Sequence, residues 1–229
     1  MAEGFSMNIV EYADREMLEM HVADVLASEL RNWLNMNDFA SFVVPGGTTP
    51  GPIFDLMSAA DLEWNRVHVL LTDERWVGEE NSHSNARLVR SRLLVGHAAA
   101  AQFVPYYRAG LSAAEGAAEV AGMLERHLPI SLLLLGMGAD MHTASLFPGG
   151  EGTEEAMSGR APLLCRVQPA TQDMERVTLP AHVLRDAMST HLVIYGEEKR
   201  AALERALSLP PEEAPIAAVL GSGTVHWAP

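Results

Sequence analysis

The alternation of short apolar runs with longer segments of helical periodicity constrains this chain most strongly. Apolar runs rich in leucine or β-branched residues occur at 39–44, 67–71, 130–135 and 191–195. Apolar residues at 18–34 recur instead at helical spacing. Repeated βα units of this kind build an open, mostly parallel sheet flanked by helices. The sequence therefore predicts an α/β fold.

Weaker patterns predict further elements. Strands are expected at 163–167, 176–179 and 225–227, and helices at 52–60, 85–94, 113–128 and 198–207. Two segments with Gly, Glu or Pro, 149–159 and 209–215, are expected to be exposed loops. The 229 residues, 48% hydrophobic and 20% charged, suit a single α/β domain spanning 1–229.

Charge and cysteine content exclude several classes of partner. Thirty Asp and Glu against sixteen Lys and Arg give a net charge of −14, with no basic stripe, so nucleic acid is not an expected partner. Residues 1–30 carry acids throughout, which predicts neither a secretory leader nor a membrane anchor. The lone Cys165 is expected to be a small buried hydrophobe. It agrees with a reducing compartment, and we predict a cytoplasmic location.

Clusters of glycine, hydroxyl and ionisable residues follow several of the predicted strands. In an open parallel sheet the carboxyl ends of the strands line the ligand crevice, so four such clusters are expected to share one site. Each cation placed there is informative, because the remainder of the chain repels anions.

The first cluster comprises Gly46, Gly47 and Thr48. The glycines let backbone N–H groups approach an anion, and the hydroxyl adds a donor near a helix start, which suits a phosphate. An ordinary strand-to-helix turn explains the segment equally well. It is not a P-loop, because Pro52 and Ile53 stand where Lys and Ser or Thr would be required.

The second cluster places Arg75 just past the strand at 67–71. Its guanidinium can hold phosphate oxygens in bidentate fashion, and the acids beside it could orient it. A surface salt bridge is the alternative for Arg75 and also for Arg176, which opens another predicted strand. Ser84 and Asn85 either contact the ligand or cap the next helix.

The third cluster contains Asp140 and His142, after two glycines that follow the strand at 130–135. Imidazole titrates near neutral pH, so a histidine at a strand end is a candidate general base. Asp140 would fix its tautomer if the chain bends there. Most of the nine histidines are expected to be structural, and position selects His142. A dinucleotide fingerprint would need glycine in place of Met141.

The fourth cluster contains Lys199, the one lysine among sixteen Lys and Arg residues, at the start of a predicted helix. A compact ammonium group is what this position offers to a ligand, although a solvated lysine kept by chance is the alternative. The sequence contains no H-E-x-x-H, cysteine pair or G-x-S-x-G, so we predict no metal, cofactor or serine nucleophile.

Taken together, these motifs resemble those of the 6-phosphogluconolactonase family. The matching stretches, in the family's order, are PGGTTP (45–50), TDERWV (72–77), SNARL (84–88), LGMGADMHTASLFPG (135–149), RVTL (176–179) and GEEK (196–199). Met141 replaces the glycine that the family usually has before the histidine. The resemblance implies a fold similar to glucosamine-6-phosphate deaminases and ribose-5-phosphate isomerases.

The resemblance also implies an activity, the hydrolysis of 6-phospho-D-glucono-1,5-lactone in the oxidative pentose phosphate pathway. His142 is then expected to deprotonate the attacking water, oriented by Asp140. Candidate contacts for the substrate and its phosphate are Gly46, Gly47, Thr48, Arg75, Ser84, Asn85, Arg176 and Lys199. Backbone N–H groups after His142, near a helix start, are expected to bind the oxyanion.

Two other functions stay open at this point. A glucosamine-6-phosphate deaminase or sugar-phosphate isomerase would use the same scaffold, but those deaminases carry a carboxylate a few residues after the histidine and residues 143–150 contain none. A non-enzymatic sugar-phosphate sensor would ordinarily need a DNA-binding module, for which this acidic chain has no room. The sequence makes no prediction of oligomeric state.

Overall fold

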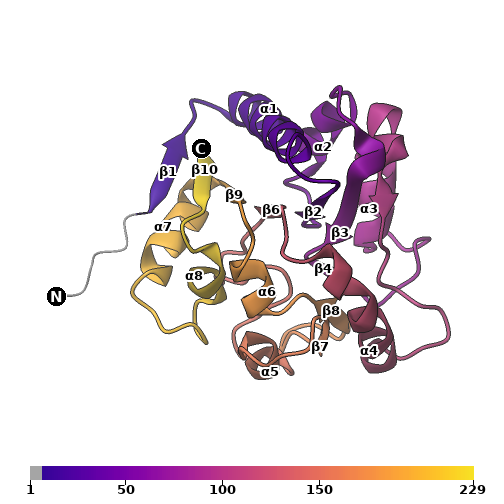
Figure 1. Cartoon of the computed structure of the whole chain (residues 1–229). Helices are drawn as coiled ribbons and strands as arrows, with labels where there is room; N and C mark the ends of the chain where they lie inside the picture. The colour runs from indigo at the N-terminus through magenta and orange to yellow at the C-terminus, as the bar shows by residue number, and fades with distance from the viewer. Residues whose placement is uncertain (1–6) are drawn as a thin grey trace.

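The computed structural model describes residues 7–229 and confirms the predicted α/β architecture, in which a parallel sheet is flanked by helices (Figure 1). Its main sheet has the strand order β1-β10-β9-β6-β2-β3-β5, and all neighbouring strands pair in parallel. The strands are β1 (Asn8–Glu11), β2 (Ala40–Val44), β3 (Val67–Leu71), β5 (Gln102–Phe103), β6 (Leu132–Leu135), β9 (Thr190–Tyr195) and β10 (Thr224–Ala228).

Helices cover both faces of this sheet (Figure 1). They are α1 (Arg15–Leu34), α2 (Gly51–Ser58), α3 (Asn85–Arg92), α4 (Ala113–Leu124), α5 (Thr153–Met157), α6 (Ala181–Arg185), α7 (Gly196–Ala206) and α8 (Pro215–Leu220). The long helix α1 begins after Asp14, whose carboxylate caps it by accepting a hydrogen bond from the Met17 N–H at 2.8 Å. Among the described helices, none is long and apolar enough to span a membrane. Residues 1–6 of the N-terminal segment, for which no leader was predicted, lie outside the described residues.

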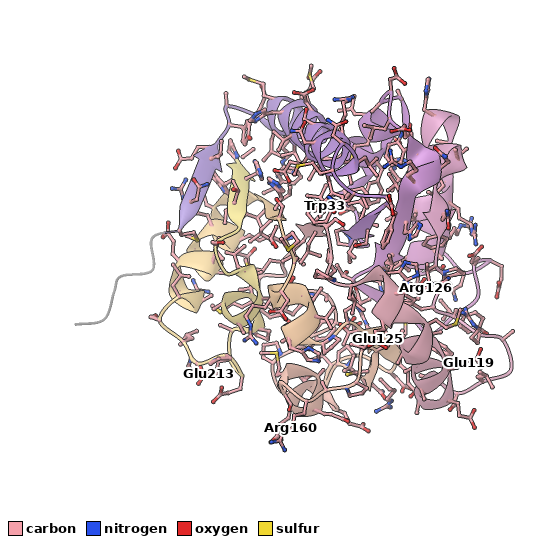
Figure 2. All side chains as sticks on the ribbon, in the orientation of Figure 1. Trp33, Glu119, Glu125, Arg126, Arg160 and Glu213 are labelled. Carbon is pink, nitrogen blue, oxygen red and sulfur yellow. The ribbon has the colours of Figure 1, made fainter. Side chains whose placement is uncertain are left out.

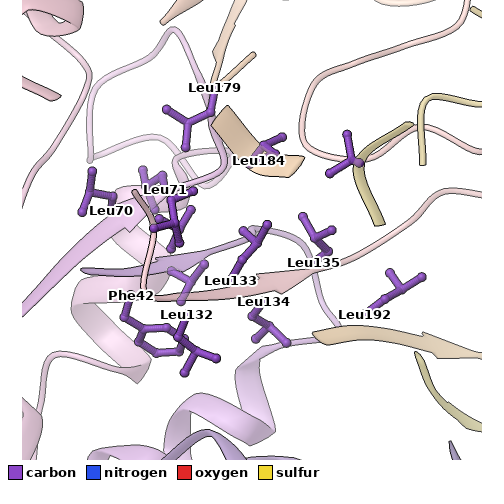
Figure 3. Packing of buried hydrophobic residues seen from close by; sticks show 14 of the residues in the cluster. Phe42, Leu70, Leu71, Leu132, Leu133, Leu134, Leu135, Leu179, Leu184 and Leu192 are labelled. Atoms are coloured by element: carbon purple, nitrogen blue, oxygen red, sulfur yellow. The ribbon is translucent and has the colours of Figure 1, made fainter. Parts of the chain in front are cut away.

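The core is built around the central strands. All four residues of β6 are buried leucines, as expected for a parallel strand covered on both faces. Leu133 and Leu135 project to one side of the strand, and Leu132 and Leu134 to the other, where Phe42 of β2 also lies (Figure 3). Charged side chains such as Glu119 project from the periphery (Figure 2).

A second, three-stranded sheet departs from the expectation of a single sheet. Two of the predicted strands, β7 (Cys165–Val167) and β8 (Arg176–Thr178), pair antiparallel in the order β4-β8-β7 with the short strand β4 (Asp73–Arg75). The chain leaves the main sheet at Thr72 and pairs with β8 instead. This pairing sets Arg75 directly opposite Arg176.

Several short elements were not predicted. Strand β1 and helices α6 and α8 have four to six residues each, too few for a periodic pattern to stand out. Helix α5 lies within 149–159, so the prediction that this whole segment is a loop was wrong. The prediction for Cys165 is confirmed, since the residue is buried and unpaired.

Candidate active site

A cavity of about 230 Å³ lies beyond the carboxyl ends of the four central strands β9, β6, β2 and β3. The chain runs from β2 to β3 on one side, and β6 then joins β2 on its other side, so the loops after β2 and β6 diverge and leave a crevice. The lining includes residues from all four predicted clusters, namely Gly46, Gly47, Thr48, Arg75, Asn85, His142, Arg176 and Lys199.

The chain bends after β6 so that Asp140 and His142 meet. The Met141 N–H donates to the Gly138 carbonyl at 2.9 Å, and the Gly138 N–H donates to the His142 carbonyl at 3.0 Å. The Asp140 Oδ1 lies 2.5 Å from His142 Nδ1 and accepts the His142 backbone N–H at 3.1 Å. A proton on Nδ1 satisfies this contact, which leaves Nε2 with the free lone pair of a base.

The electrostatics of this pair favour an ionised Asp140. Partial burial raises the pKa of the carboxyl, but the hydrogen bond and charge interaction with His142 outweigh burial and lower the pKa below its ordinary value. The His142 side chain is 28% exposed, so a water molecule can reach it. Asp140 is therefore placed to hold the imidazole in one tautomer and to stabilise its protonated form.

Gly138 provides the space that the imidazole occupies. A Cβ atom at this position would lie 2.3 Å from both Cε1 and Nδ1 of His142 and 2.6 Å from the Asp140 carboxylate. Real carbon contacts are about 3.5 Å or longer. The glycine is thus required by the packing of the pair.

Met141 keeps the turn in the conformation for which glycine is better suited. Its φ is +69°, in the left-handed region, although it carries a side chain. Met141 is only 7% exposed, and its backbone carbonyl accepts the Ile216 N–H at the start of α8. The substitution therefore retains the bend that brings Asp140 to His142, and buried apolar contacts offset the backbone strain.

Arg75 and Arg176 bring two positive charges to the cavity without a carboxylate partner. Neither forms an ion pair with any described residue, so the salt-bridge alternative is not what the structure shows. The Nε atoms of both are buried and lack a hydrogen-bond partner among residues 7–229. Burial lowers the pKa of Arg176, and the neighbouring charge of Arg75 lowers it further. An anionic ligand would pair with these buried guanidinium groups and would also reduce the repulsion between their charges.

Glu74 supports this arrangement through the backbone. The sequence suggested that the acids beside Arg75 could orient its guanidinium, but Glu74 accepts only backbone N–H groups. Its fully buried carboxylate accepts the backbone N–H groups of Arg75, Asn85 and Ala86 at 2.7 to 2.9 Å. Burial raises the pKa of Glu74 to about 7 despite these donors. The Asn85 Oδ1 in turn accepts from the Arg75 guanidinium at 3.1 Å, so the carboxylate fixes both cavity residues through their backbones.

The glycines after β2 fit this network. A Cβ on Gly46 would lie 1.9 Å from Asn85 Oδ1, and Gly47 adopts φ +84°, so both positions need glycine. Ser84 does not line the cavity. Its hydroxyl accepts the Arg87 N–H at 3.1 Å as the cap of α3, which is the alternative that the sequence left open.

Lys199 reaches the cavity from the first turns of α7, which begins at Gly196. Asp73 also lines the cavity but was not singled out from the sequence. Its carboxylate accepts the hydroxyls of Thr72 and Ser145, both at 2.6 Å. The only local signal for Asp73 is its position in the TDER stretch, because its partner Ser145 is far away in the sequence.

The expected helix start after His142 is absent. The chain forms a bridge between Thr143 and Leu146, and the next helix is α5, beginning at Thr153. The Ser145 N–H already donates to the Thr178 hydroxyl at 3.2 Å. The prediction of oxyanion donors at a helix start there was wrong, because residues 143–146 form a tight turn instead of the first turn of a helix. Within residues 7–229, no group of three or more His, Cys, Asp or Glu side chains is placed to hold a metal ion.

Comparison with known proteins gives consistent matches over most of the chain. The family described as glucosamine-6-phosphate isomerases/6-phosphogluconolactonase matches residues 13–227. Proteins named 6-phosphogluconolactonase are 41% identical in Pseudomonas aeruginosa, covering 91% of this chain and 89% of that protein, and 37% identical in Rhizobium meliloti, covering 98% and 100%. The crystal structure of a 6-phosphogluconolactonase from Shewanella baltica superposes with a TM-score of 0.94 at 32% identity, covering 98% of this chain and 99% of that one.

Proposed function

Since this chain belongs to the glucosamine-6-phosphate isomerase/6-phosphogluconolactonase family, we infer that it is a lactone hydrolase that converts 6-phospho-D-glucono-1,5-lactone to 6-phospho-D-gluconate in the oxidative pentose phosphate pathway. Relatives with this name cover nearly the whole chain at 30–41% identity. The substrate is a small phosphosugar lactone, and the candidate cavity has a volume of about 230 Å³.

The proposed mechanism is carried by one observation: His142, whose Nδ1 contacts Asp140, lines the same cavity as three cations, Arg75, Arg176 and Lys199, that form no ion pair within residues 7–229. His142 Nε2 takes a proton from a water molecule as the water oxygen attacks the lactone carbonyl carbon. The tetrahedral intermediate then collapses, the bond from the carbonyl carbon to the ring oxygen breaks, and the imidazolium returns the proton to that oxygen. Asp140 stabilises the imidazolium formed between these steps.

The phosphate end of the substrate is assigned to the cations. Arg75, Arg176 and Lys199 neutralise the phosphate, and the backbone of Gly47 and the hydroxyl of Thr48 add donors. Phosphate and ester lie at opposite ends of the lactone. Binding energy at the phosphate can therefore place the carbonyl beside His142, which is how a remote group contributes to rate.

Two further assignments accompany the activity. A contiguous hydrophobic core includes residues of both sheets, which supports the treatment of the chain as one domain. We keep the prediction of a cytoplasmic location. The single thiol, Cys165, is buried, and burial raises its pKa to about 12, so it is poorly suited to disulfide exchange.

The test is turnover of the phosphorylated lactone by the purified chain, followed at slightly acidic pH where spontaneous hydrolysis is slow. His142→Ala should lower kcat roughly 10²–10⁴-fold while inorganic phosphate still binds. The matched control, His97→Ala, changes an exposed histidine outside the cavity and should leave kcat within twofold. Absence of turnover by the native chain, or ammonia release from glucosamine-6-phosphate, would overturn the assignment.

A further inference from the structure

Phe147 contacts two members of the site without lining the cavity. Its ring stacks on the His142 imidazole, with centroids 4.3 Å apart and planes inclined by 24°. The Arg176 guanidinium carbon lies over the same phenyl ring, 4.9 Å from its centroid. Phe147 is 7% exposed and is not among the residues that line the cavity. The phenylalanine therefore reaches the substrate site through these two neighbours.

The stacking completes the confinement of the imidazole. Asp140 holds the Nδ1 edge at 2.5 Å, and the bare backbone of Gly138 lies against the Cε1 and Nδ1 atoms. These contacts restrain one edge of the ring, and Phe147 restrains its face. Nε2 makes no hydrogen bond within residues 7–229 and is left for the reacting water.

We propose that Phe147 is a positioning residue that holds the imidazole of His142 for proton transfer and links it to the anion bound at Arg176. This inference rests on the proposed function. The face of a phenyl ring attracts cations, so the stack strengthens when His142 takes up the proton of the attacking water. Phe147 thus favours the protonated state that forms during the reaction over the neutral state that precedes it.

Arg176 supplies the link to substrate binding. The guanidinium and the imidazole lie 4.9 Å and 4.3 Å from the centroid of the same phenyl ring, so the imidazolium of His142 forms across this ring system from a positive charge that has no carboxylate partner among residues 7–229. A phosphate on Arg176 neutralises this charge and removes the repulsion. The other charged groups around the imidazole are Asp140, which contacts Nδ1, and the cavity-lining residues Asp73, Arg75 and Lys199. Phosphate binding at Arg176 therefore makes it easier for His142 to take up a proton, and Phe147 lies between the two groups.

The experiment compares Phe147→Leu with Phe147→Tyr on the phosphorylated lactone. Leu keeps an apolar side chain but has no ring, so kcat should fall about 3–10-fold with KM within twofold, and the acid limb of the pH profile of kcat should move roughly half a unit lower. Tyr keeps the ring and should stay within twofold of the native chain. The matched control is Phe103→Leu, which removes a ring with Arg90 at the same 4.9 Å but outside the cavity, and should leave kcat unchanged.

The proposal fails if Phe147→Leu keeps native kcat and pH profile, if it changes KM alone, or if Tyr loses as much activity as Leu. A folding defect is separated by thermal unfolding. If the Leu variant does not fold, Phe147→Met takes its place, and Tyr must then exceed Met in kcat. A readout independent of turnover is the NMR titration of the His142 imidazole, whose midpoint should be lower in the Leu variant. If the native chain does not hydrolyse the lactone but the NMR midpoints of the native chain and the Leu variant still differ, the proposed function is wrong and the positioning role of Phe147 stands.

Discussion

Gly138→Ala adds a single methyl group and tests whether the position of the imidazole carries the reaction. Gly138 does not have a positive φ, so alanine would meet no left-handed backbone strain there. The new Cβ would lie 2.3 Å from His142 Cε1 and Nδ1. Ordinary contact needs about 3.5 Å. The ring must retreat by roughly 1.2 Å, because the alternative is to open the turn that holds it.

That displacement sets the expected magnitude. A misplacement of about 1 Å of a reacting group can cost 10²-fold in rate, and complete loss of a general base costs roughly 10²–10⁴-fold. We therefore expect Gly138→Ala to lower kcat by at least about 10²-fold. Inorganic phosphate should still bind with native affinity, because the three cations are untouched. The melting temperature should change little, since side chains rather than backbone meet the new methyl.

The assay is lactone hydrolysis at slightly acidic pH together with phosphate binding by calorimetry. Gly122→Ala is the matched control, because a Cβ there meets nothing within 4 Å and the residue lies in α4 away from the cavity. A kcat for Gly138→Ala within threefold of native, with the fold intact, would refute the reasoning that the confined position of His142 matters.

Three other perturbations address separate parts of the structure. Arg75→Ala should raise KM for the phosphorylated lactone more than tenfold and reduce its preference over plain gluconolactone; unchanged preference in competing-substrate assays would contradict the phosphate assignment. Met141→Gly and Met141→Ala should both lower the free energy of unfolding, because each loses buried apolar surface. The Ala variant should be the less stable of the two by about 1 kcal/mol, because alanine keeps the strained φ of +69°. The reverse order in denaturant melts would show that this φ carries no strain. Burial, then neighbouring charges, lowers the pKa of both His127 and His226 to about 4. The unfolded chain therefore takes up protons first, and stability should fall as pH drops from about 6.5 to 4, by on the order of 1–3 kcal/mol for each histidine. Thermal melts across this interval measure the loss, and His226→Asn should flatten part of it; a melting temperature independent of pH there would contradict the burial argument.

Several residues that the sequence singled out by their local chemistry line the candidate cavity. His142 was identified because an imidazole follows a strongly apolar strand, and Arg75 because a cation follows another. Asp73 was missed as a lining residue, since its partner Ser145 is 72 residues away and the pairing depends on how two loops meet. The sequence left the role of Ser84 open, because a serine at this position suits both a helix cap and a ligand contact.

The sequence by itself determined the βα alternation, the acidic surface and the motifs that end each strand, because these depend on residue types within a few positions of one another. Tertiary structure alone decided that Thr72 leads the chain out of the main sheet, and that β4 pairs with β8. That pairing sets Arg75 opposite Arg176, and the bend at Met141 brings Asp140 onto His142. These features depend on contacts between segments far apart in the chain and on a backbone conformation that methionine rarely adopts, so neither periodicity nor composition can specify them.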